Sequence, residues 1–160
     1  MKKIFAPTVT ALLLLMILAS TTFAAPAAGE RQLPLKGSID ATETQQVAFP
    51  LNHINVTGSG NATQLGRFTY SLQAVLHIPT LSATATATIV AADGSSLFAA
   101  GSGQGTPTAT PGIVSIVETL TITGGTGRFE GASGNITIQR LVNRATLASS
   151  GTISGTIVLP

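Results

Sequence analysis

The sequence of 160 residues contains no cysteine and no tryptophan, and only 9% of its residues are charged and 4% aromatic. The lack of cysteine excludes a disulfide framework, a thiolate metal site and a cysteine nucleophile. Beyond residue 25, no apolar run approaches the roughly 18 residues that a membrane-spanning helix requires. Aliphatic residues are nevertheless plentiful, so the chain does not belong to the disordered class. Its length fits a single globular domain.

The longest apolar run lies at the N-terminus and has the order of an export signal. Two lysines precede an apolar segment over residues 11–18, and Thr22 and Ala24 are small residues at the two positions that a signal peptidase inspects. This order predicts a signal peptide over residues 1–24, since the apolar segment is too short for an uncleaved membrane anchor. We therefore expect a secreted or periplasmic protein, cleaved near Ala24, that continues with a flexible lead over residues 25–32.

Removal of the signal peptide changes the charge of the chain. The full sequence has a formal net charge of +2, but Lys2 and Lys3 lie in the predicted signal peptide. The remaining chain has six basic and six acidic side chains and no cluster of lysine or arginine. The electrostatic basis for nucleic-acid binding is therefore missing, and we expect no nucleic-acid partner.

Two-residue alternation of apolar and polar side chains recurs after the lead. The clearest example covers residues 67–78, where Phe68, Tyr70 and Leu72 share one face. Such alternation, bounded by glycine-rich turns, is typical of half-buried strands. The predicted strands cover residues 33–39, 45–49, 67–78, 83–89, 97–103, 114–122, 136–142 and 147–157.

About eight short strands predict an all-β domain, either a sandwich or a closed barrel. Glycines on the inner faces favour the barrel over residues 33–160, because glycine permits the bending that closure requires. Asp93-Gly94 predicts a hairpin turn. The proline-containing segment 50–55, which includes His53, is predicted to be a loop.

Glu118 and Arg140 are charged residues that the alternation places on the inner face. A hairpin with Ile122 opposite Ile136 would bring Glu118 opposite Arg140, with Cβ atoms about 4.5–5.5 Å apart. Such a pair would offset the cost of burying a carboxylate. Three roles stay open for the pair: a structural ion pair, a group that orients a ligand, and acid–base catalysis.

Tyr70, the only tyrosine, is predicted to point inward and completes a set of candidate ligand-binding residues with Glu118 and Arg140. The alternative is that Tyr70 only fills core volume. The inward residues of segment 83–87 are alanines, which either let opposite walls approach or leave a void.

No residue pattern identifies a reaction. His53 and His77 are the only histidines and have no carboxylate at a metal-ligating spacing, so we expect no metal site and no cofactor. No serine lies in a Gly-x-Ser-x-Gly elbow, so a serine hydrolase is not supported. The sequence therefore assigns no catalytic residue, and the catalytic residues are unknown.

The segment from Thr123 to Gly134 is the most distinctive part of the sequence. We expect its glycines to end one strand and release the next, and its phenylalanine to fill the core. This structural turn motif consists of Gly124, Gly125, Gly127, Phe129, Gly131 and Gly134. The segment resembles the signature of the dirigent and allene oxide cyclase group, and still more that of bacterial secreted proteins with allene oxide cyclase barrel-like domains. Segments 60–69 and 91–98 are similar to further patterns of those bacterial proteins.

The resemblance implies an eight-stranded antiparallel barrel and, from the plant members, a trimeric homo-oligomer. It transfers no catalytic residue, and plant dirigents typically carry arginine where Ser133 stands. Three functions therefore stay open. The first is an exported barrel domain that binds a small apolar ligand in its lumen. The second is an isomerase, cyclase or dirigent-like enzyme acting inside the barrel, and the third is a structural or self-associating surface protein.

Overall fold

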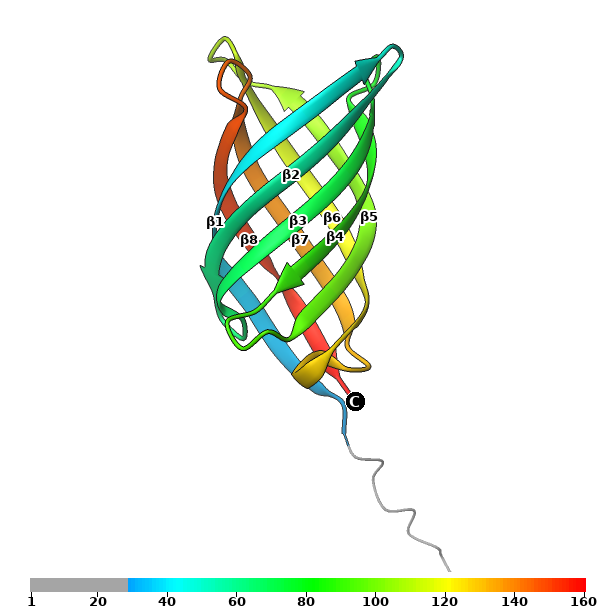
Figure 1. Ribbon diagram of the computed structural model, residues 1–160, viewed down its shortest axis with the longest axis vertical. Helices are drawn as coiled ribbons and strands as arrows, with labels where there is room; N and C mark the ends of the chain where they lie inside the picture. Colours follow the sequence, from blue (N-terminus) through cyan, green and yellow to red (C-terminus); the bar gives the residue numbers. More distant parts are fainter. Residues whose placement is uncertain (1–28) are drawn as a thin grey trace, which may run out of the picture.

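The computed structural model describes residues 29–160, so the predicted signal peptide and the cleavage position near Ala24 lie outside the described residues. Eight strands and one short 3-10 helix follow in chain order: β1 (Arg31–Ala48), β2 (Leu51–Ala62), β3 (Gly66–His77), β4 (Ser82–Val90), β5 (Ser96–Pro107), β6 (Ile113–Gly125), η1 (Gly127–Phe129), β7 (Ser133–Asn143) and β8 (Ala148–Leu159). Neighbouring strands are antiparallel, and β8 pairs with β1. The prediction of an all-β, eight-stranded antiparallel barrel is confirmed (Figure 1).

Side-chain alternation explains how the sheet builds its core. On β3, Phe68, Tyr70 and Leu72 are buried, whereas the intervening Thr69 and Ser71 are exposed. The inward faces of all strands meet in one apolar cluster, and pairing between β1 and β8 closes the sheet into a barrel.

The strand assignments at the start of the barrel need correction. The predicted strands over 33–39 and 45–49 are parts of one strand, β1, which begins at Arg31. The segment 50–55, predicted as a loop, contains the start of β2, and His53 is an exposed residue of that strand. The total of eight is right because one strand was divided and another was missed.

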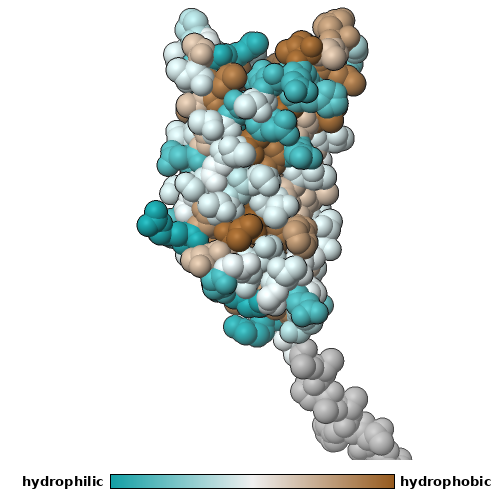
Figure 2. Space-filling view, in the orientation of Figure 1, coloured by the Kyte–Doolittle hydropathy of each residue, from teal (hydrophilic) through white to brown (hydrophobic). Residues whose placement is uncertain are grey.

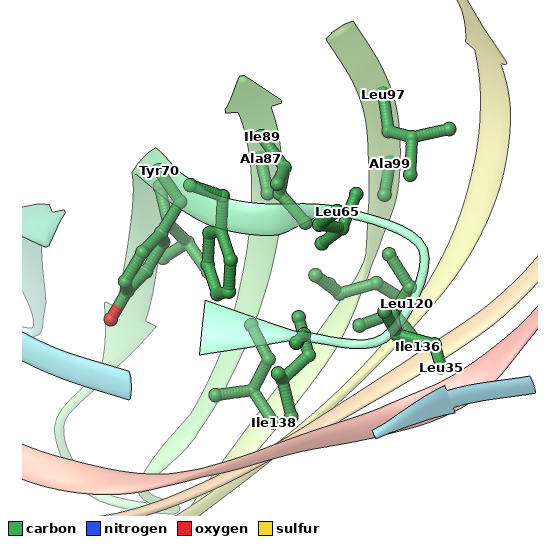
Figure 3. Close-up of a cluster of buried hydrophobic side chains, with 14 of the residues drawn as sticks. Leu35, Leu65, Tyr70, Ala87, Ile89, Leu97, Ala99, Leu120, Ile136 and Ile138 are labelled. Atoms are coloured by element: carbon green, nitrogen blue, oxygen red, sulfur yellow. The ribbon is translucent and has the colours of Figure 1, made fainter. Parts of the chain in front are cut away.

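The barrel has two ends, which we call terminal and distal. The terminal end holds the start of β1, the end of β8, the β2–β3 and β4–β5 turns and η1, and the distal end holds the other hairpin turns (Figure 1). Phe129 of η1, Leu65 of the β2–β3 turn and Leu97 of β5 are almost completely buried. Figure 3 shows Leu65 and Leu97 among other buried aliphatic side chains. The terminal half of the lumen is therefore filled by apolar side chains.

The glycine-rich turn motif connects β6 to β7 through η1 at the terminal end. Gly127 has a φ of +61°, and a Cβ there would overlap the side chain of Ser95. Gly134 has a φ of +123°, and a Cβ there would overlap the carbonyl oxygen of Thr156. Both positions therefore require glycine. The turn they permit directs Phe129 into the core, where its side chain is only 1% exposed.

The outer wall is dominated by serine and threonine, with apolar side chains gathered near the distal end (Figure 2). The β1–β2 hairpin carries the exposed Val47, Phe49 and Leu51. No helix within residues 29–160 is long and apolar enough to cross a membrane.

Candidate functional site

Arg140 is the centre of a buried ion network in the distal half of the lumen. Its Nε donates to Oε2 of Glu118 at 3.2 Å, and its Nη2 donates to Oε1 of the same carboxylate at 2.8 Å. Both side chains are almost fully buried, with residue exposures of 4% for Arg140 and 3% for Glu118. Such a two-point contact fixes the carboxylate and the guanidinium in one mutual orientation.

The predicted register of this hairpin is wrong by two residues. Ile122 pairs with Gly134 rather than with Ile136, and Glu118 therefore lies opposite Ile138. The ladder begins earlier because β7 starts at Ser133, directly after the compact turn around η1. The ion pair forms on the diagonal, which a long arginine side chain can span.

Glu43 of β1 is a third member of the network and was missed in the sequence. Its Oε1 accepts a hydrogen bond from Nη1 of Arg140. The same Nη1 also lies 3.4 Å from Oγ of Ser149 on β8. Glu43 is buried and continues the inward positions of Leu35, Ile39 and Ala41 on β1. Extending the alternation of β1 past Ile39 would have found it.

Amide side chains extend the network toward the distal end. Nε2 of Gln45 donates to Oε2 of Glu43 at 3.2 Å, and Nδ2 of Asn52 donates to Oε1 of Gln45 at 3.1 Å. The other side-chain atom of Asn52, Oδ1, is buried and has no hydrogen-bond partner within residues 29–160. One acceptor of the network is therefore left free.

Tyr70 lies between the apolar core and the ion network. Its ring packs against Gly58 on β2, and its hydroxyl points away from the labelled leucine side chains in Figure 3. The hydroxyl is buried without a hydrogen-bond partner in the described part of the chain. Burial raises the pKa of Tyr70 to about 12, against the opposing effect of the positive charge of Arg140. The hydroxyl therefore stays protonated at neutral pH and can donate a hydrogen bond.

The charge state of Arg140 is fixed by its partners. Burial alone would lower the pKa of the guanidinium, but the hydrogen bonds and negative charges of Glu118 and Glu43 raise it above its usual value. Arg140 is thus a permanent cation that orients two carboxylates.

A narrow crevice adjoins the network inside the barrel. Its volume is about 30 Å³, and both Glu118 and Arg140 line it. The remaining wall is mostly small or aliphatic and includes Ala74, Ala83, Ala85, Gly103, Ile54 and Ile116. At Gly103 an added Cβ would come within 3.2 Å of Cγ of Glu118, so the glycine leaves room for the carboxylate. The alanine row therefore leaves a small void.

Larger depressions lie on the outer wall and do not involve the ion network. One of them, with a volume of about 570 Å³, is an open depression that crosses several strands and is lined by His53, Gln73 and Thr86 among others. We place the candidate site in the lumen because only there do buried polar groups converge on an apolar wall among the described residues.

The histidines take no part in the site. His53 is exposed on β2, and Nδ1 of His77 lies 3.0 Å from Oγ1 of Thr80 in the β3–β4 turn. Within residues 29–160 no three histidine, aspartate or glutamate side chains form a group that could hold a metal ion.

A solved structure shares this barrel. The chain is similar to the pterocarpan synthase dirigent protein GePTS1, with a TM-score of 0.58 and 14% sequence identity, over 88% of this chain and 98% of that chain. No protein-family model matches the sequence, and no curated protein matches it. The resemblance to bacterial allene oxide cyclase barrel-like proteins stays a prediction. At 14% identity the structural likeness shows the fold alone, a closed eight-stranded barrel of the dirigent type.

Proposed function

We propose that this barrel domain binds a small, largely apolar ligand in the distal half of its lumen. The observation that carries the proposal is the meeting of the Glu118–Arg140 pair with a crevice lined by alanine and glycine. Binding sites commonly combine an apolar wall with a few fixed polar groups that orient the ligand. Glu118 and Arg140 would provide the orientation, and the unpaired hydroxyl of Tyr70 a further hydrogen bond.

The proposal is tested by titrating the protein with 1-butanol and following methyl resonances by NMR. We expect saturable shifts at Ala83 and Ala85, and loss of these shifts in an Ala83→Leu variant, whose larger side chain fills the crevice. Thr86→Val, on the outer face of the same strand, is the matched control and should bind normally. Shifts confined to outer-wall residues, or shifts that survive Ala83→Leu, would contradict the proposal.

Catalysis inside the barrel is the second candidate function, and the free hydroxyl of Tyr70 favours it. A protonated hydroxyl beside a buried acid–base network can deliver a proton to a bound substrate. The structural neighbour is named as a pterocarpan synthase, which supports a dirigent-like isomerase or cyclase only by analogy of fold. If the protein is an enzyme, Tyr70→Phe should retain a bound compound from a host extract but fail to convert it, as measured by mass spectrometry.

We also propose that the protein is exported and forms a homo-oligomer. Intact mass of the protein from its host should show cleavage after Ala24, and native mass spectrometry should show a homo-oligomer, which the sequence resemblance predicts to be a trimer. A monomer with an uncleaved N-terminus would contradict both.

A further inference from the structure

The buried acidic and basic side chains inside the barrel are unequal in number. Two carboxylates, Glu43 and Glu118, share the single guanidinium of Arg140, and all three side chains are buried. Every other charged side chain within residues 29–160 is exposed. An unmatched negative charge in a closed apolar barrel is costly unless a cation or a proton neutralises it. The network thus has room for one more positive charge.

The unpaired oxygens beside the network specify the hydrogen bonding of a ligand. Oδ1 of Asn52 can only accept a hydrogen bond, and the residue is 5% exposed and faces the lumen opposite Leu76, which lines the crevice. The hydroxyl oxygen of Tyr70 can also accept, and its ring lies against Gly58 close to Ala41, the inward neighbour of Glu43. An ammonium group offers three donors and no acceptor, whereas a carboxylate offers no donor. These unpaired atoms therefore match an ammonium group.

The crevice limits the size of the group it can admit. Its volume of about 30 Å³ exceeds the roughly 10–15 Å³ that one water requires. It is far smaller than the roughly 300–1,000 Å³ of pockets that hold drug-sized molecules. The crevice therefore suits a small, thin group along the alanine side chains rather than an aromatic ring.

We propose that the ligand is a small primary alkylamine in its protonated form, with the ammonium group beside Glu43 and Asn52 and the alkyl chain in the crevice. This inference rests on the proposed function, because it names the ligand class of the same lumen site. It adds that the ligand carries a positive charge and that Glu43 selects for this charge.

Three probes of equal chain length separate the contributions of charge and apolar contact. Butylammonium chloride, 1-butanol and sodium butyrate are titrated into the full protein at neutral pH and followed by NMR. We expect butylammonium to bind at least tenfold more tightly than 1-butanol, and butyrate not to bind. If 1-butanol binds as tightly as butylammonium, the inference is wrong and the proposed function stands. If neither probe gives saturable shifts at Ala83 and Ala85, the proposed function itself is wrong.

Glu43→Gln is the decisive variant, because it removes the excess negative charge and leaves both hydrogen bonds between Arg140 and Glu118 in place. Butylammonium affinity should fall at least tenfold while 1-butanol affinity stays the same. Glu130→Gln, an exposed acid next to η1, is the matched control and should change neither. Unchanged butylammonium binding by Glu43→Gln overturns the inference.

A second variant keeps the test decisive if Glu43→Gln does not fold. Asn52→Leu removes the free acceptor without changing a charge, and folding is checked by circular dichroism. Weaker binding of butylammonium relative to 1-butanol supports the inference, and an unchanged ratio of the two affinities overturns it.

Discussion

The terminal and distal halves of the barrel are filled by different kinds of side chains. The terminal half is filled by large apolar side chains, with Phe129 of η1 at its centre. The distal half uses small apolar side chains and one buried ion network around Arg140. Apolar packing involves no charge, whereas buried charges are stable only with partners that neutralise them. The difference indicates that the terminal half maintains the fold, and it is in the distal half that we propose the binding site.

The outer contacts of the terminal end reinforce this division. Arg128 of η1 forms an exposed ion pair with Asp93 of the β4–β5 turn at 2.9 Å, and its guanidinium lies 4.7 Å from the ring centroid of Phe129. Its backbone nitrogen also donates to Oγ of Ser95 at 3.2 Å. These contacts therefore link η1 to the β4–β5 turn. At the distal end, the exposed Phe49 of the β1–β2 hairpin lies outside the core instead.

The largest effect is expected in the distal half, from Arg140→Met. The substitution removes the only cation between two buried carboxylates and should lower the free energy of unfolding by about 5 kcal/mol, the upper end for breaking a buried pair. Urea denaturation measures the loss. The exposed Arg67→Met is the control, and an equal loss in both variants would contradict a special role of the network.

Phe129→Ala tests the terminal half and should come next in size. Truncation of a buried phenylalanine leaves a cavity and should lower the free energy of unfolding by about 4 kcal/mol. The matched control is Phe49→Ala, since Phe49 is 77% exposed and its loss should change stability by less than about 0.5 kcal/mol. An equal loss of stability in Phe49→Ala would contradict the role of Phe129 in filling the terminal half.

The two halves also differ in how well the sequence predicts them. Inward orientation of Glu118 and Arg140 follows from alternation alone, because the period of a strand is two residues. Their register does not follow, since it depends on where the turn around η1 releases β7, and a compact turn moves the ladder by two residues. Glu43 was missed because small and polar residues between Ile39 and Gln45 hide the end of the apolar pattern on β1.

The alternation of apolar and polar residues is interrupted more strongly on β2. Its inward positions include Asn52, Gly58 and Gly60 as well as Ile54 and Val56, so hydrophobicity does not alternate clearly. The polar inward residue serves the ion network, and the glycines make room for the rings of Tyr70 and Phe68. Alternation therefore predicts a strand poorly where the inward residues are polar or small because of their contacts with neighbouring strands.

The smallest of the three effects concerns Tyr70, which lies where the two halves meet. Its pKa is raised from 10.0 to about 12 in the folded protein, mainly by burial. The folded state therefore holds the proton more tightly than the unfolded state, so its stabilising effect is complete below pH 10 and is lost as the pH rises to about 12. A shift of this size corresponds to about 2–3 kcal/mol.

Because Tyr70 is the only tyrosine and the chain has no tryptophan, its ionisation can be followed directly by tyrosinate absorbance. Denaturation curves between pH 9 and pH 12 should show the loss of stability in the wild type. Tyr70→Phe should lack that loss, which separates it from the titration of exposed lysine. A Tyr70 that ionises near pH 10 in the folded protein would show that water reaches its hydroxyl. The filled core would then end below Tyr70, and the distal cavity would extend further into the barrel than the crevice beside Glu118.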